Sequence, residues 1–315
     1  MKACDTQNMS LTSFKFVLNW LKRNNFKAVR LIGGEPSIFP EIETFIDTVI
    51  SYHFFEEILI FSNFTFDHKF AEMIVEKNKQ IRIDFLPNIN EFDLIIPKHK
   101  ENILNNLDYM FKNMPNLGQI GINVYRPDMD LTQWEDLIAK YAPQLNNLRY
   151  CIAIPTKAIV ENNFDFYEYY SQFDDIMNKI VDIGEKYNIR IGVDCNNVPP
   201  CCFKDSTIAR IYKSNPEMLN NGQEFYCGFP VIDCRPDLSI AGCFGFNCPE
   251  ISEKTLKDFR TFEEIRAWCQ QVGDTSNLIA RKECLDCERW KRFGHSCSCK
   301  TTHLIDKNTL EKKMR

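Results

Sequence analysis

Residues 28–36, with the sequence AVRLIGGEP, decide the fold of this chain. The apolar run from Ala28 to Ile32 predicts a buried β-strand, and the pair Gly33-Gly34 ends it. Two glycines at the end of a strand let the backbone approach a ligand closely, and the carboxylate of Glu35 can accept hydrogen bonds from an amine. The alternative interpretation is a tight strand-to-helix turn in which Pro36 is a rigid turn residue.

The sequence on both sides of this turn, up to residue 194, alternates between two hydrophobic periods. Apolar residues spaced three or four apart predict helices at 14–21, 42–50, 70–76, 103–114, 134–141 and 173–183. Short apolar or alternating runs predict strands at 28–32, 58–61, 81–86, 120–125, 150–155 and 189–194. The alternation predicts right-handed βαβ units with a parallel sheet, either as an open barrel or as a doubly wound sheet.

In both architectures the functional site lies at the carboxyl ends of the strands. Polar residues follow several of the predicted strands: Ser62, Asn63, Asn88, Asn123 and Arg126. Each of them can contact a ligand, or can serve as an ordinary turn or cap residue.

Composition excludes several classes of protein. The chain has 315 residues, 44% of them hydrophobic, and a net charge of −5, so no basic surface for nucleic acid is expected. No apolar run approaches the roughly 20 residues of a membrane span, and the first residues contain no apolar signal-peptide core. We therefore expect a cytoplasmic protein without a nucleic-acid or membrane partner.

Cysteines are concentrated near the C-terminus. The chain has 14 of them. In a reducing compartment such a cluster indicates metal ligands, whereas in a secreted protein it would indicate disulfides. Thiolates bind iron–sulfur clusters or zinc, and spacing alone does not separate the two. The candidate ligands are Cys227, Cys234, Cys243, Cys248, Cys284, Cys287, Cys297 and Cys299.

The segment LIGGEP, residues 31–36, in an alternating α/β region resembles the radical S-adenosylmethionine (radical SAM) enzymes. The resemblance implies a partial (β/α)6 barrel of the TIM type that lacks its first strand, in which this turn contacts the amino group of the SAM methionine moiety. The strand ending at Ser62-Asn63 resembles the next strand of that family, which often ends in Thr-Asn-Gly, with Phe64 here in place of Gly. The implied SAM-binding residues are Gly33, Gly34, Glu35, Pro36, Ser62 and Asn63.

Radical SAM enzymes carry a CxxxCxxC motif that holds a [4Fe–4S] cluster, and here only Cys4 fits its third cysteine. Two explanations are open: a chain truncated at its N-terminus, or a degenerate homologue that has lost the radical cluster. With either explanation, the chain as written is not expected to hold a complete radical-generating cluster.

Residues 235–243, RPDLSIAGC, resemble the hairpin of a SPASM domain, with Leu238 in place of a Gly. That domain carries auxiliary [4Fe–4S] clusters, and Cys284-x2-Cys287 matches the start of its second cysteine run, whereas the spacing to Cys297 and Cys299 departs from it. One residue of the pair Cys201-Cys202 is a further candidate ligand, and the role of Cys195 is open. The predicted domains are a partial barrel at 1–194, a linker at 195–226, a small cysteine-rich cluster domain at 227–303 and a tail at 304–315.

The resemblance implies an enzyme that generates a deoxyadenosyl radical for hydrogen abstraction, with SAM and [4Fe–4S] clusters as cofactors. It also implies an electron donor such as flavodoxin or ferredoxin and, at family level, a peptide or protein substrate. The sequence assigns no catalytic residue. The alternatives are a non-catalytic iron–sulfur protein that keeps the fold, and a zinc-binding interaction module.

Overall fold

The computed structural model describes residues 8–89, 96–153, 166–193, 198, 200–214, 233–241 and 253–277. Within these residues the main body has six parallel strands in two sheets, and the order of the strands follows the sequence. The first sheet contains β1 (Ala28–Leu31), β2 (Glu57–Ser62) and β3 (Arg82–Pro87). The second contains β4 (Gln119–Val124), β5 (Asn147–Ile152) and β6 (Arg190–Val193).

The two sheets join between β3 and β4. Asn88 and Gly121 form a parallel bridge there, and the Ile89 amide donates to the Gly121 carbonyl at 2.9 Å. A Cβ atom on Gly121 would lie 2.7 Å from Asn88 Oδ1 and 3.2 Å from the Pro87 carbonyl oxygen, so a larger residue would force this junction to shift. The sheets thus form one continuous arc of six strands.

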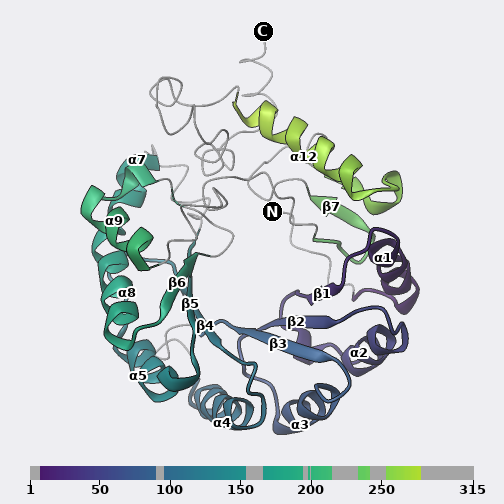
Figure 1. The fold of residues 1–315 in the computed structure, drawn as a ribbon, viewed down its shortest axis with the longest axis horizontal. Coiled ribbons are helices and arrows are strands. Elements are labelled where there is room, and N and C mark those ends of the chain that lie inside the picture. Colours follow the sequence, from purple (N-terminus) through teal and green to yellow (C-terminus); the bar gives the residue numbers. More distant parts are fainter. Residues whose placement is uncertain are drawn as a thin grey trace.

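Helices cover the outer side of the arc and the strands lie inside it (Figure 1). The helices of the main body are α1 (Leu11–Arg23), α2 (Ile42–Ser51), α3 (His68–Lys77), α4 (Pro97–Asn113), α5 (Thr132–Tyr141), α7 (Phe166–Ser171), α8 (Asp174–Tyr187) and α9 (Asp205–Ser214). Short 3₁₀ turns are η1 (Pro36–Ile38), η3 (Ala142–Gln144) and η4 (Pro200–Cys202). Sequential parallel strands with helices on one side correspond to the open-barrel prediction rather than to a doubly wound sheet.

Successive side chains of a strand point to opposite faces of the sheet, as β2 shows: one set packs in the core under the helices, and the other faces the inner side of the arc. Ile58 and Ile60 of β2 are fully buried in one core with Ile46 of α2 and Ile74 of α3. The neighbouring Phe61 faces inward, where the Arg149 guanidinium of β5 lies 5.7 Å from its ring centroid. Strands β2 and β5 are not neighbours, so this contact across the inner side shows how strongly the sheet curves.

The predicted strand at 150–155 was placed too far along the chain. β5 begins at Asn147, which pairs with Gln119 of β4 and with Arg190 of β6. This register buries Leu148 and Ile152 against the helices. The two neighbouring strands therefore fix the position of β5, and a single sequence does not contain that information.

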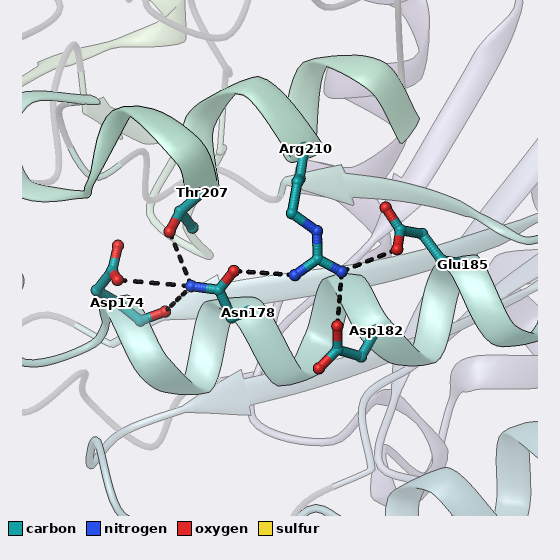
Figure 2. Close-up of polar contacts among 6 residues, drawn as sticks. All are labelled: Asp174, Asn178, Asp182, Glu185, Thr207 and Arg210. Atoms are coloured by element: carbon teal, nitrogen blue, oxygen red, sulfur yellow. Dashed lines mark hydrogen bonds and ion pairs between the residues drawn. The ribbon is translucent and has the colours of Figure 1, made fainter.

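Helix α9 lies within residues predicted as a linker, and a polar network attaches it to α8 (Figure 2). Asn178 donates to Thr207 Oγ1 at 2.8 Å and accepts from Arg210 at 3.0 Å. Arg210 also donates to Asp182 at 2.6 Å and to Glu185 at 2.8 Å. Ile208 and Ile211 of α9 are buried in the main core, so this helix packs onto the main body.

A second, smaller core joins α1 to the C-terminal described segment. That segment contains the antiparallel pair β7 (Ser239–Ala241) and β8 (Glu253–Thr255), the turn η5 (Leu256–Asp258) and α12 (Phe262–Asn277). Trp20 of α1 is 1% exposed, packs with Ile240 and Trp268, and donates from Nε1 to the Phe259 carbonyl at 2.8 Å. In the described segments, no helix is both long and apolar enough to cross a membrane.

Candidate functional site

The Gly-Gly-Glu-Pro turn and the end of β2 are joined through the side chain of Glu35. Glu35 Oε1 accepts from Ser62 Oγ at 2.8 Å and from Ser37 Oγ at 2.8 Å, while Oε2 accepts from the Asn63 amide at 2.8 Å. We call these contacts the Glu35 junction. The structure thus brings together the predicted residues Glu35, Ser62 and Asn63 at the carboxyl ends of two adjacent parallel strands.

Local sequence explains the geometry of the junction. Glu35 is extended and caps the short turn η1, in which Pro36 is buried at the first position. Ser62 is 4% exposed, and its Oγ accepts from the Phe64 amide at 3.0 Å while it donates to Glu35. Since these donors already bond the carboxylate, Glu35 shapes the turn, and its role as an acceptor for an amine stays a prediction.

Gly33 and Gly34 are exposed, and no contact with the described residues requires glycine at either position. A Cβ atom built on either residue meets no atom of the described residues within 4 Å, and neither backbone has the left-handed φ that favours glycine. Gly121 and Gly184 differ, because a Cβ on either would approach a neighbouring atom to 2.7 Å. None of the described residues therefore blocks the approach of a ligand to the backbone at residues 33 and 34.

Two residues occupy positions where the radical SAM and SPASM patterns have glycine. Phe64 has a φ of 62° and Leu238 a φ of 69°, both in the left-handed region. Phe64 is fully buried against Phe66 and Phe85, and Leu238 is 4% exposed. The backbone conformation expected of glycine is present at both positions, and buried side chains hold it in place.

Sequence reasoning missed one residue that supports the site, Asn106 of α4. It is 2% exposed and donates to the Phe64 carbonyl at 2.9 Å and to the Phe66 carbonyl at 2.7 Å. The available signal was a single amide on the apolar stripe formed by Ile103, Leu107 and Met110. A polar residue on a buried helix face requires hydrogen-bond partners, so its position in the apolar stripe indicates a contact with a neighbouring segment.

The other polar candidates lie at the ends of β3 and β4. Asn88 takes part in the bridge between the two sheets, and Asn123 is on β4. Arg126 follows β4 and forms an ion pair of 3.3 Å with Asp128. A ligand role for these three residues stays a prediction.

Most of the cysteine predictions lie outside the described residues. These are Cys4, Cys195, Cys227, Cys243, Cys248, Cys284, Cys287, Cys297 and Cys299. Among the residues that the structure describes, no group of three or more His, Cys, Asp or Glu side chains could hold a metal ion. The metal-ligand predictions for these cysteines therefore stay predictions.

Three candidate cysteines are described. Cys202 is buried in the main core, whereas its neighbour Cys201 is exposed, so the two side chains diverge as expected. Cys234 bridges to Ile240 and packs against the core around Trp20. Burial, together with the charges of Asp237 and Asp233, raises the pKa of the Cys234 thiol to about 12.

Comparison with known proteins gives a result at the level of fold. No protein-family model matches the sequence, and no curated protein matches it either. The structure is similar to the crystal structure of Streptococcus suis SuiB, with a TM-score of 0.56 and 12% sequence identity, over 88% of this chain and 65% of the SuiB chain. The chain therefore spans less than two thirds of the length of SuiB, and what the two share is their fold.

Proposed function

We propose that this chain is the main body of a radical SAM enzyme in which residues 33–36 bind SAM. The observation that carries the proposal is the Glu35 junction beside two exposed glycines at which no described residue would obstruct a Cβ atom. The junction lies at the carboxyl ends of parallel strands, which is where ligands bind in folds of this architecture. The shared fold with SuiB supports the same assignment.

The described residues fit the methionine end of SAM. The exposed backbone of Gly33 and Gly34 can approach the ligand without a side chain in the way. Glu35 holds this turn against Ser62 and Asn63, and its negative charge favours the ammonium group of SAM nearby. The role of the turn is therefore to bind and orient SAM, and no proton transfer is assigned to it.

The remaining cofactors would be [4Fe–4S] clusters held by cysteines. Together with an electron from a reduced cluster, bound SAM supplies a deoxyadenosyl radical that can take hydrogen from a substrate. We assign the auxiliary clusters to Cys227, Cys234, Cys243, Cys248, Cys284, Cys287, Cys297 and Cys299. We also propose a peptide or protein substrate and a flavodoxin or ferredoxin as electron donor.

A second candidate follows from the cysteine positions. The C-terminal cysteines can bind metal with or without radical chemistry, so this candidate is a protein that keeps the fold and the C-terminal metal sites alone. The metal in those sites would be iron–sulfur or zinc, because thiolates bind both.

Anaerobic purification followed by two measurements tests the proposal. Calorimetric titration with SAM measures binding, and the visible spectrum with iron, sulfide and zinc analysis identifies the metal. We expect SAM binding and a brown protein that contains iron and sulfide. Absence of SAM binding would refute the SAM site, and a colourless protein with stoichiometric zinc would refute the clusters. Formation of 5′-deoxyadenosine from SAM under reducing conditions separates the enzyme from the second candidate.

A further inference from the structure

The segment from Ser62 to Phe66, which we call loop 62–66, connects β2 to α3. Each of its residues takes part in a hydrogen bond with a side chain. Asn63 Oδ1 accepts from the Thr65 amide at 3.0 Å and from Thr65 Oγ1 at 2.6 Å. Phe64 is in the left-handed region, which is unfavourable for a residue with a Cβ atom. The surrounding contacts therefore have to keep this loop in its conformation.

Helix α4 provides those contacts from outside the loop. The Asn106 side chain donates to the carbonyls of Phe64 and Phe66, and Asn102 Nδ2 lies 3.4 Å from the Thr65 carbonyl. Asn106 uses both of its N–H groups in these bonds, and its 2% exposure excludes water as a substitute. Three successive carbonyls of the loop thus accept hydrogen bonds from one face of α4.

The same loop forms half of the Glu35 junction. Ser62 Oγ and the Asn63 amide both donate to the Glu35 carboxylate, and the Phe64 amide donates to Ser62 Oγ. A displacement of loop 62–66 would therefore move the partners of Glu35. Because Glu35 directly follows Gly34, such a movement would change the turn that we propose as the SAM site.

We infer that Asn106 is a positioning residue for SAM binding, acting through loop 62–66 and Glu35. The inference rests on the proposed function. Asn106 itself touches neither the turn nor the glycines, so it positions the site without contacting the ligand. Its removal is expected to weaken SAM binding and not only the stability of the fold.

Asn116 offers a matched control at the opposite end of the same sheet. Its Nδ2 donates to the Ile83 carbonyl at 2.8 Å, and it also contacts Asp84 near the amino end of β3. Both asparagines thus bond main-chain carbonyls, but only Asn106 does so at the carboxyl ends of the strands. A general loss of stability would affect both variants, whereas a loss of positioning would affect only one.

The experiment compares N106L, N116L and the wild type as full chains, with SAM as the titrated ligand. Hydrogen exchange is followed at the amides of Ser37 and Asn63, which both donate to Glu35. We expect both variants to unfold at lower urea concentration than the wild type. Only N106L should bind SAM about tenfold more weakly and should exchange these two amides faster.

Wild-type SAM affinity and exchange rates in a folded N106L would overturn the inference. If N106L does not fold, N102A replaces it, because it removes only the longer bond, and about threefold weaker binding is expected. Unchanged affinity in N102A would then count against the inference. If the wild type itself does not bind SAM, the proposed function fails, and exchange at Ser37 and Asn63 decides the positioning role by itself.

Discussion

Glu35 and Ser62 are hydrogen-bonded at 2.8 Å although 27 residues separate them in the sequence. The bond connects the turn after β1 to the end of β2, so two segments that are predicted separately form one site. A half-buried carboxylate that accepts several hydrogen bonds stabilises both segments.

The first prediction concerns this carboxylate. E35A should lower the free energy of unfolding by about 2 kcal/mol, because hydrogen bonds to a charged group contribute more than neutral ones. S37A removes one donor and leaves Ser62 and Asn63 in place, so its effect should stay below about 1 kcal/mol. Urea unfolding measures both values, and equal effects of the two variants would show that Glu35 does not join the strands.

The second prediction separates ligand approach from folding at the glycines. G33A and G34A should leave the free energy of unfolding unchanged or raise it by about 0.5 kcal/mol, because alanine fits and restricts the unfolded chain. SAM binding should nevertheless weaken. G121A is the control, since its Cβ would meet Asn88, and it should destabilise the protein. Wild-type SAM affinity in both G33A and G34A would contradict the proposed approach.

The third prediction tests the backbone conformation of Phe64. Both F64G and F64A lose a buried aromatic side chain, which costs about 3 to 5 kcal/mol. Glycine adopts the left-handed region freely and alanine does not, so F64G should be about 1 kcal/mol more stable than F64A. At Phe85, on a regular strand, the order should reverse, with the alanine variant the more stable. The same order at both positions would contradict the prediction.

The fourth prediction concerns the attachment of the C-terminal segment to α1. W20F removes the hydrogen bond from Nε1 to the Phe259 carbonyl and leaves that carbonyl buried. The expected loss is about 1 to 3 kcal/mol in unfolding free energy. Trp134 is a matched control, because it is equally buried and its Nε1 has no partner among the described residues. W134F should therefore cost less than W20F.

The fifth prediction is a pH dependence that arises at Asp174. Burial alone would raise the pKa of Asp174, but hydrogen bonds from Lys204 and Thr207 and the charge of Lys204 outweigh it and lower the pKa. A carboxylate whose pKa is lower in the folded state stabilises the protein above its unfolded pKa, and this contribution is lost as pH falls. The wild type should therefore lose stability between about pH 5 and pH 3 more steeply than D174N. Parallel curves for the two proteins in urea unfolding would contradict this account.

Much of the main body follows from the sequence. The strands β1 to β4 and β6 and the helices around them were predicted from hydrophobic period, since each buries one face against the core. The Gly-Gly-Glu-Pro turn is predicted as a site from its two glycines and its carboxylate, which is also local information.

Contacts between distant segments could not be predicted in this way. Ser62 bonding to Glu35, Asn106 bonding to loop 62–66 and the start of β5 all depend on which elements become neighbours. The network between Asn178 and Arg210 could not be predicted either, since it also depends on which elements become neighbours. Its helix α9 lies in a region without the alternation of strands and helices. A single sequence specifies local period and turn chemistry, and it does not specify these pairings.

The bond between Trp20 and Phe259 determines how late in synthesis the Trp20 side chain can be buried. The two residues are 239 positions apart, so the apolar face of α1 is synthesised long before its cover. At ribosomal speeds of about 5 to 20 residues per second, roughly 10 to 50 s pass between the synthesis of Trp20 and that of Phe259. During that interval the nascent chain presents an uncovered tryptophan surface, and this surface is where we would look first for contact with a chaperone.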